Sequence, residues 1–487
     1  MAVQIINRTI TRTKRELGER ILGQALGLLG SHPDHNAKYF IKAINRVAAG
    51  ERGEMVRQWV EHWLSEGQPG REFLGRIARN IHPNVRRRFI ARMFMSLFFR
   101  DRAVIERCQE QYGVSPPQCM VVSPSMRCNY RCQGCYSASY ERNDDMPPEV
   151  FDRILSEAEE MGIRFFIMVG GEPFIYPDLL KVLGRHSQSF FQIYTNGFFI
   201  DKKVARQLVE MGNVAPMISV NGPEAFTDAS RVEGSFDVVV RAMDNLREVG
   251  GIFGFSPLAT RLNADAVCTD EWIDFLVEKG ALYGWLFLYM PVGRDPDTEL
   301  MPTPEQRDKL RVFVRHVRQT RPIIPIDFWN DGPLAGSCLA GGRHYFHVNH
   351  RGDVEPCIFC HFTTHNIHES SLGEVLSSPF FKAIRESQPL SYNTLLPCPI
   401  IDHPDTLWKL IREHGARPTH EGADKMFTTL APQIKEYGEK VHRKMGEAWD
   451  EGDYPEWAPA WARLCGFSPE KLEERRREFE KSRGREP

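Results

Sequence analysis

Three cysteines lie close together in the segment Cys128-Asn-Tyr-Arg-Cys132-Gln-Gly-Cys135. Thiolates spaced this closely can bind one soft metal centre. Three protein ligands leave one coordination position open, and a [4Fe–4S] cluster with such an open iron can bind a small molecule. A structural zinc site needs four ligands, and the next histidine along the chain is His186. The triplet therefore favours a reactive iron–sulfur centre over a structural metal site.

The composition of the chain indicates the cell compartment in which we expect the protein. The chain has 487 residues, 42% hydrophobic and 26% charged, which is typical of a folded globular protein. Residues 1–30 carry several charges and lack the apolar core of a signal peptide. No stretch approaches about 18 uncharged apolar residues, so we expect no membrane-spanning helix. We expect a cytoplasmic protein, in which the 11 cysteines are thiols or metal ligands rather than disulfides.

The cysteine triplet follows the first of six short apolar segments that alternate with helical stretches. The apolar segments are residues 120–123, 165–169, 191–194, 215–220, 253–258 and 284–289. Six strand–helix units predict an α/β fold with a parallel sheet, specifically a partial (β/α)6 TIM-type barrel. In such a barrel the chemistry gathers at the carboxyl ends of the strands.

Further motifs follow these predicted strands. They are Gly170-Gly171-Glu172-Pro173, Thr195-Asn196-Gly197, Ser219-Val-Asn221-Gly-Pro, Arg231 ahead of Gly234-Ser-Phe-Asp, and Leu288-Tyr-Met-Pro-Val-Gly293. Together with Cys-x3-Cys-x2-Cys they occur in the order found in radical S-adenosylmethionine (radical SAM) enzymes. The chain resembles that superfamily over residues 120–293.

The resemblance implies a cofactor site built from these motifs. Gly170, Gly171, Glu172 and Pro173 would hold the amino group of the methionine part of S-adenosylmethionine (SAM). Glycines admit close backbone approach, and a carboxylate pairs with an ammonium. Thr195 and Asn196 would line the site. Ser219 and Asn221 would contact the ribose and the methionine carboxylate, Arg231 would pair with that carboxylate, and the segment 288–293 would contact the adenine.

Two positions depart from the family pattern. Many relatives have an aromatic residue just before the third cysteine, whereas this chain has Gly134, with Tyr136 just after Cys135. We therefore expect adenine stacking to differ here. Asn221 stands where an aspartate is common, and it keeps an acceptor oxygen without the charge.

A second cysteine set comprises Cys338, Cys357, Cys360 and Cys398. Tyr345 to Asn349 alternates in polarity and is followed by the turn Arg351-Gly352-Asp353, which predicts a hairpin. The arrangement resembles the auxiliary-cluster extensions called SPASM and twitch domains, without the full seven cysteines of SPASM. We expect a twitch-like single auxiliary [4Fe–4S] cluster on these four thiols. A zinc site on the same thiols, or a cluster that does not use Cys360, stays open.

The resemblance also implies a mechanism. A [4Fe–4S] cluster on Cys128, Cys132 and Cys135 would reductively cleave SAM, and the resulting 5′-deoxyadenosyl radical would abstract hydrogen from an unactivated carbon. A reducing partner such as flavodoxin or ferredoxin would supply the electron. The auxiliary cluster favours a redox outcome. A non-catalytic iron–sulfur electron-transfer protein is the alternative, but it would give the Gly-Gly-Glu-Pro motif no purpose.

The N-terminal segment bears on the substrate. Residues 1–107 hold 20 Lys/Arg against 10 Asp/Glu, and Asn84 to Arg100 combines arginines with large apolar side chains. Such a helix could lie on an anionic membrane surface, close over a lipid-like substrate, or simply pack on the barrel. We expect a small-molecule, lipid or peptide substrate, with the lipid-like class favoured and peptide maturation as the alternative. We expect peripheral membrane contact if the lipid reading holds, and no nucleic acid partner.

These observations divide the chain into four expected parts. Residues 1–115 form a helical N-terminal region, and 116–325 the radical SAM core. Residues 326–400 form a loop-rich auxiliary-cluster region, and 401–487 a helical C-terminal region.

Overall fold

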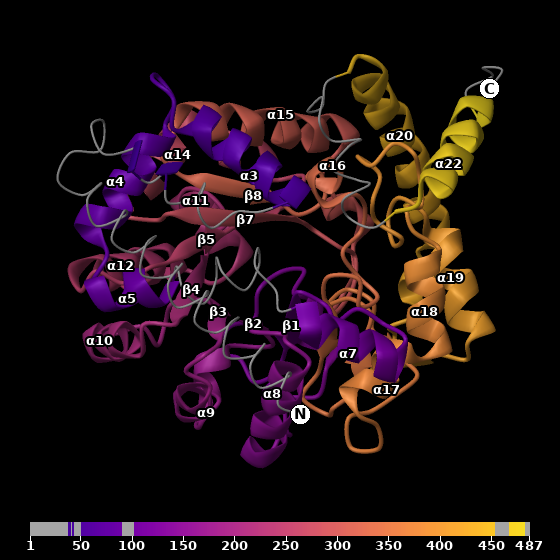
Figure 1. The fold of residues 1–487 in the computed structure, drawn as a ribbon, viewed down its shortest axis with the longest axis horizontal. Helices are drawn as coiled ribbons and strands as arrows, with labels where there is room; N and C mark the ends of the chain where they lie inside the picture. The colour runs from indigo at the N-terminus through magenta and orange to yellow at the C-terminus, as the bar shows by residue number, and fades with distance from the viewer. Residues whose placement is uncertain (1–37, 40, 43–49, 90–101, 453–466, 483–487) are drawn as a thin grey trace.

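A ten-stranded sheet lies at the centre of the protein (Figure 1). The computed structural model describes residues 38–39, 41–42, 50–89, 102–452 and 467–482. The strands of the barrel run parallel to one another: β1 Cys119–Val122, β2 Phe165–Met168, β3 Phe190–Thr195, β4 Val214–Ser219, β5 Gly254–Ser256, β6 Leu258–Ala259, β7 Tyr283–Leu288 and β8 Ile324–Asp327. The predicted segments all form strands, and the predicted α/β partial barrel is confirmed.

Helices follow the strands and cover the outer side of the sheet (Figure 1). They are α8 Pro148–Glu160, α9 Leu179–Arg185, α10 Lys202–Met211, α11 Glu224–Ser230, α12 Ser235–Glu248, α13 Ala264–Val267, α14 Asp270–Lys279 and α15 Pro304–Thr320. Their ends agree with the local sequence. Asp201 caps α10 by accepting from the Val204 N–H, and Gly212 ends that helix at a φ of 68°. Thr303 and Gln306 form a capping box on α15.

The sheet continues beyond β1 into the predicted hairpin. Strands β9 His347–Val348 and β10 Val354–Glu355 pair antiparallel, which confirms the hairpin, and β9 also pairs parallel to β1. The order is β10-β9-β1-β2-β3-β4-β5-β7-β6, with β8 beside β7. The barrel is therefore open, and the cysteine-rich region is joined to the strand that leads into the cysteine triplet.

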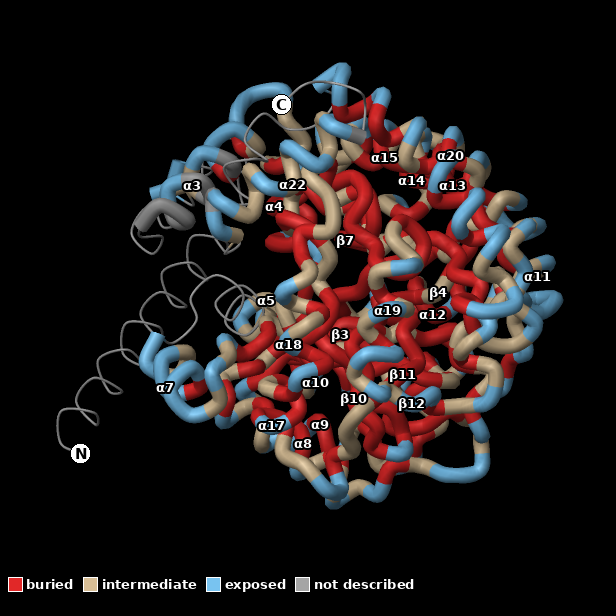
Figure 2. The backbone as a smooth tube through the Cα atoms, turned by 90° about the vertical axis from the view of Figure 1, so that its right-hand side faces the viewer, coloured by how far each residue is buried: buried red, intermediate tan, exposed pale blue. Residues whose placement is uncertain are grey.

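The C-terminal half adds a layer of helices beside the open barrel (Figure 1). These are α16 Gly332–Ala335, α17 Leu372–Ser377, α18 Pro379–Glu386, α19 Pro404–Glu413, α20 Ala431–Asp450 and α22 Pro469–Ser482. A two-stranded sheet pairs β11 Phe362–Thr363 with β12 Arg417–Pro418. Short 3-10 helices also lie in the described loops: η2 Tyr136–Ser139, η3 Pro173–Ile175, η4 Thr298–Leu300 and η5 Lys425–Phe427. Buried hydrophobic residues of the barrel and of this layer belong to one core cluster, and buried segments lie in both parts of the chain (Figure 2).

The described part of the N-terminal region is helical: α3 Gly50–Trp63, α4 Gly70–Asn80, α5 Pro83–Phe89 and α7 Arg102–Tyr112. Helices α4 and α5 close the amino end of the barrel. Buried Arg76 donates to the carbonyls of Ala281 and Pro322, just before β7 and β8. Asn84 donates to the carbonyls of Val209 and Glu210, at the end of α10.

This placement bears on the basic, aromatic segment from Asn84 to Arg100. Val85 is 1% exposed, and the Phe89 ring packs edge-on against Phe190 of β3 at 5.6 Å. The segment's described part therefore packs on the barrel, at the end opposite the strands' carboxyl ends. Of the three alternatives for this segment, packing on the barrel is therefore the one that the described part adopts, and residues 90–100 lie outside the described residues.

No helix among the described residues is both long and apolar enough to span a bilayer.

Candidate functional site

The loop that carries Cys128, Cys132 and Cys135 begins where β1 ends, and all three cysteines are partly exposed. The loop after β2 runs alongside it. Gly171 N–H donates to the Ser125 carbonyl at 3.1 Å, and Glu172 N–H donates to the Arg127 carbonyl at 2.8 Å. Two predicted motifs, far apart in the sequence, are thus held together by backbone hydrogen bonds.

The two glycines of this second motif are required by close backbone contact. A Cβ on Gly171 would lie 2.1 Å from the Arg127 carbonyl oxygen, and one on Gly170 would lie 2.2 Å from that of Ser125. Gly170 also has a φ of 122°, which L side chains rarely adopt. The glycines therefore fix the distance between the cysteine loop and Glu172.

The Glu172 carboxylate is buried and faces the end of β3. It accepts hydrogen bonds from the Thr195 hydroxyl at 2.8 Å, the Asn196 N–H at 2.8 Å and the Phe174 N–H at 3.1 Å. Burial raises its pKa to about 7 in spite of these bonds. Glu172 forms no ion pair with a described residue, so its buried carboxylate could still pair with a cationic ligand.

Asn196 links the motif Thr195-Asn196-Gly197, at the end of β3, to the cysteine loop by a hydrogen bond. Its amide donates to the Asn129 side-chain oxygen at 2.8 Å, one residue after Cys128. The aromatic ring of Tyr130 meets that of Phe198, which is 49% exposed, at 6.5 Å. The structure therefore brings together the predicted residues Cys128, Glu172, Thr195 and Asn196.

Arg231 follows α11, and its positive charge partly offsets the burial that raises the pKa of Cys132 and of Glu172. Its Nε is buried without a hydrogen-bond partner, and one of its other nitrogens donates to the Asn221 side-chain oxygen at 3.4 Å. A buried guanidinium N–H without an acceptor fits an anionic group such as a ligand carboxylate.

Asn221 is engaged with protein groups. Its side-chain oxygen accepts from the Leu258 N–H at 3.0 Å as well as from Arg231, and its amide donates to Ser230. Asn221 therefore orients Arg231, and its contact with a ribose stays a prediction. Ser219 lies at the end of β4, paired with Ser256 of β5.

The glycine that replaces the usual aromatic residue also has a structural reason. Gly134 has a φ of 64°, and a Cβ there would lie 2.4 Å from the ring of Tyr289, in the segment after β7. Tyr289 is 1% exposed. The space beside the third cysteine is thus filled by a tyrosine from the segment 288–293.

The second cysteine set lines one cavity of about 40 Å³. Cys338, Cys357, Cys360 and Cys398 all border it, together with Phe328, Trp329 and Phe359. Backbone N–H groups of Ala340, Phe359 and Ile400 point at three of the sulfurs at 3.4 Å. The Tyr345 hydroxyl donates to the Cys357 sulfur at 2.9 Å.

This donor set fits an iron–sulfur cluster. Four soft ligands surround an apolar cavity, and hydrogen bonds to sulfur are among the means by which proteins tune such clusters. Burial raises the pKa of Cys357 to about 12, so only a bound metal would keep this thiol ionised. Within the described residues, no three Cys, His, Asp or Glu side chains converge on a single-ion site.

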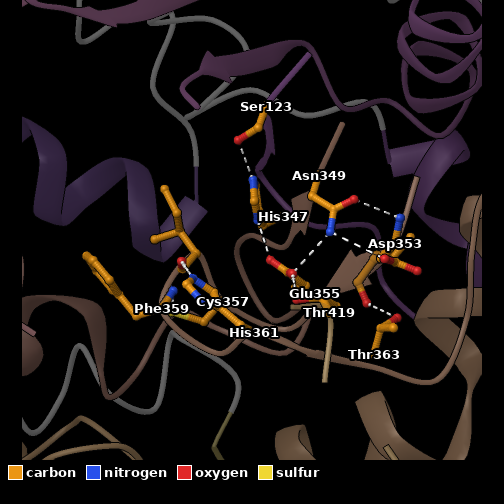
Figure 3. Close-up of polar contacts among 12 residues, drawn as sticks. Ser123, His347, Asn349, Asp353, Glu355, Cys357, Phe359, His361, Thr363 and Thr419 are labelled. Carbon is orange, nitrogen blue, oxygen red and sulfur yellow. Dashed lines mark hydrogen bonds and ion pairs between the residues drawn. The ribbon is translucent and has the colours of Figure 1, made fainter. Parts of the chain in front are cut away.

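A buried polar network joins the two cysteine regions (Figure 3). The Ser123 hydroxyl, just after β1, lies 2.7 Å from His347 Nε2, and His347 Nδ1 lies 2.6 Å from the Glu355 carboxylate. Glu355 also accepts from the hydroxyls of Tyr140 and Thr419, each at 2.6 Å. The network fixes the hairpin before Cys357 against the strand before Cys128.

The sequence analysis did not predict this network, whose members lie far apart along the chain. Asp327 and Asp331, at the end of β8 and just after it, are not among the residues that border the cysteine cavity. In the structure Asp327 accepts from the backbone of Trp329 and Asn330, and Asp331 pairs with Arg318. The aromatic residues between them, Phe328 and Trp329, line the cysteine cavity instead.

Comparison with known proteins decides the family. The sequence model of the radical SAM superfamily matches residues 122–267, and that of the SPASM iron–sulfur cluster-binding domain matches residues 338–399. The mycofactocin maturase MftC of Mycolicibacterium smegmatis is 30% identical over 311 residues, covering 58% of this chain and 77% of the maturase. The chain belongs to the radical SAM superfamily. It is a radical SAM enzyme with a SPASM auxiliary region, and the iron–sulfur match favours a cluster over zinc on the second cysteine set.

Other relatives of this radical SAM enzyme differ in their chemistry. The AdoMet-dependent heme synthase of Oleidesulfovibrio alaskensis is 24% identical, covering 55% of this chain and 77% of the synthase. The PqqA peptide cyclase of Streptomyces rochei is 25% identical, covering 55% of this chain and 77% of the cyclase. The crystal structure of SuiB from Streptococcus suis shares the fold, with a TM-score of 0.50 and 20% identity over 58% of this chain and 71% of SuiB.

Proposed function

We propose that this radical SAM enzyme modifies a peptide. The observation that carries the proposal is the similarity to the mycofactocin maturase, which covers 77% of that protein and 58% of this chain. The PqqA peptide cyclase is a further relative, and its name states a peptide substrate. The lipid-like expectation loses its support, because the described part of the basic helix packs at the amino end of the barrel.

Two oppositely charged residues would bind the two charged groups of the methionine part of SAM. Glu172 would accept the methionine ammonium, since it is a buried carboxylate beside the cysteine loop. Arg231 would pair with the methionine carboxylate through the Nε that has no partner in the protein. Gly170, Gly171 and Pro173 would set the backbone, while Thr195 and Asn196 orient Glu172. Ser219 and Asn221 would lie toward the ribose.

When bound to Cys128, Cys132 and Cys135, the [4Fe–4S] cluster would supply the electron that splits SAM into methionine and a 5′-deoxyadenosyl radical able to take hydrogen from an unactivated carbon. Cys338, Cys357, Cys360 and Cys398 would hold the auxiliary cluster in its apolar cavity. The aromatic side chains around that cavity exclude water from it. A flavodoxin- or ferredoxin-type donor would reduce the enzyme.

The first experiment tests the radical chemistry. Anaerobically reconstituted enzyme is mixed with SAM and dithionite, and 5′-deoxyadenosine is measured by chromatography. We expect production that is lost in the triple variant Cys128→Ala/Cys132→Ala/Cys135→Ala. A protein that binds iron but forms no 5′-deoxyadenosine would be an electron-transfer protein instead.

The second experiment tests the substrate class. Short peptides encoded beside the gene are incubated with the enzyme under the same conditions, and their masses are measured. We expect a peptide to raise 5′-deoxyadenosine formation and to change in mass. Iron-coproporphyrin serves as the comparison substrate, because heme synthases are among the relatives. Turnover with the porphyrin and with none of the peptides would contradict the peptide proposal while leaving the radical chemistry intact.

A further inference from the structure

The segment that carries Cys398 is held by a buried ion pair. Arg307 of α15 and Asp402 both have side chains that are 0% exposed, and Arg307 is among the largest fully buried side chains described. The two form a bidentate pair: Arg307 Nη1 lies 2.6 Å from Asp402 Oδ1, and Nη2 lies 3.2 Å from Oδ2. They are 95 residues apart in the sequence.

The remaining bonds of Arg307 lead to the same region. Nη2 also donates to the Leu395 carbonyl at 2.9 Å, and Nε donates to the Asn330 side-chain oxygen at 3.2 Å. The guanidinium thus holds the chain on both sides of Cys398. A buried ion pair is costly to desolvate, and an apolar pair would often stabilise a fold at least as well. The stability of the fold alone therefore does not explain why an ion pair is buried beside Cys398.

The carboxylate of Asp402 reaches the auxiliary cavity through one hydrogen bond. Asp402 Oδ2 accepts from the Cys398 N–H at 2.9 Å, and the Asp402 N–H donates back to the Cys398 carbonyl at 3.1 Å. The Cys398 side chain borders the cavity with the other three cysteines. A full negative charge therefore lies beside a cluster ligand, and the positive charge that balances it is Arg307.

A charge that lies one hydrogen bond away from a cluster ligand changes the reduction potential of the cluster. An added negative charge disfavours taking up an electron and lowers the reduction potential, whereas an added positive charge raises it. With both partners present, the pair is neutral and also fixes the Cys398 backbone. We propose that Arg307 and Asp402 are positioning residues that set the reduction potential of the auxiliary cluster through their matched charges beside Cys398.

The test changes each charge alone and then both. The variants are Asp402→Asn, Arg307→Gln and the double variant, all made in the full-length enzyme and purified anaerobically. The potential of each cluster is measured by redox titration followed by electron paramagnetic resonance. Addition of SAM identifies the signal of the cluster on Cys128, Cys132 and Cys135, which serves as the internal reference. No substrate is needed, so the result does not depend on the peptide proposal.

We expect opposite shifts from the two single variants. Asp402→Asn leaves Arg307 unbalanced and should raise the auxiliary potential, while Arg307→Gln leaves Asp402 unbalanced and should lower it. The double variant should return toward wild type, and the reference cluster should not move. Arg318→Gln is the matched control, because Arg318 lies on the same helix and pairs with Asp331 without bonding a cysteine segment.

Several outcomes would overturn the inference. Shifts of the same sign in both single variants, or none in either, would leave the pair a structural anchor only. Loss of about four irons in either single variant would also overturn the inference, because the pair would then be needed to hold the auxiliary cluster rather than to set its potential.

Discussion

At the scale of single residues, the group that bears most directly on cofactor binding is the buried carboxylate of Glu172. Glu172 is 1% exposed and is oriented by Thr195, Asn196 and Phe174. Glu172→Gln keeps the shape and removes the charge. It should weaken SAM binding by roughly tenfold to a hundredfold, the loss of one charged hydrogen bond of about 1.5–3 kcal/mol. Isothermal titration of the reconstituted enzyme measures this, and iron content should stay unchanged. Equal affinity in both proteins would contradict the assignment of Gly170 to Pro173.

The same carboxylate predicts a pH dependence. Burial raises the pKa of Glu172 from 4.5 to about 7, so the group is largely neutral below that pH and cannot attract an ammonium. SAM affinity should therefore fall as the pH drops from 8 to 6. Without SAM, the stability contributed by this group has the opposite sign: it is full below pH 4.5 and is lost as the pH rises through 7. Both trends should be weaker in Glu172→Gln, and an unchanged affinity profile in that variant would assign the titration to another group.

Gly171 makes a steric prediction. Gly171→Ala would put a Cβ 2.1 Å from the Arg127 carbonyl oxygen, next to Cys128. Backbone must move to relieve this contact, so the cysteine loop should shift and the first cluster should bind poorly. Iron analysis should show a selective loss of about four irons. Gly184→Ala is the control, because a Cβ there meets nothing within 4 Å.

Candidate site residues could be named from the sequence where they belong to a short, recognisable motif. Cys128, Glu172 and Asn196 are such cases. The pair of Arg307 and Asp402 could not, because nothing local connects residues 95 apart. One signal was present: Arg307 shares a helix face with Leu310, Val314 and Val317, and an arginine among such apolar residues needs a buried partner.

At the scale of elements, alternating apolar segments were enough to predict the strands of the barrel. The hairpin before Cys357 was also predictable from its alternation and turn. Its addition to the barrel sheet beside β1 was not, because strand pairing across more than 200 residues depends on tertiary packing. The Ser123 to His347 hydrogen bond, 224 residues apart, belongs to the same joint.

The N-terminal helices make a prediction at this scale. If α5 closes the amino end of the barrel, its buried side chain must contribute to stability. Val85→Ala should lower the free energy of unfolding by about 1–2 kcal/mol, since it removes buried methyl groups. Chemical denaturation measures this. Arg87→Ala is the control, because Arg87 is exposed on the same helix and its loss should change stability by less than about 0.5 kcal/mol. Equal effects of the two substitutions would place α5 away from the barrel.

At the scale of the whole molecule, the protein presents two cysteine centres joined by one sheet. The first lies at the carboxyl ends of the parallel strands, and the second lies where the chain leaves the barrel. The network of Ser123, His347 and Glu355 fixes one against the other. Such a rigid joint keeps the distance between two redox centres constant, which is what electron exchange between them requires.

This architecture predicts the iron content. The anaerobically purified enzyme should hold about eight irons, from two four-iron clusters. The variant Cys128→Ala/Cys132→Ala/Cys135→Ala should keep about four, because the second cavity is built by a separate set of thiols. Conversely, Cys338→Ala/Cys398→Ala should lose the other four and keep the SAM-responsive signal. Wild-type protein with only about four irons, or a triple variant with none, would mean that the two centres are not independent clusters.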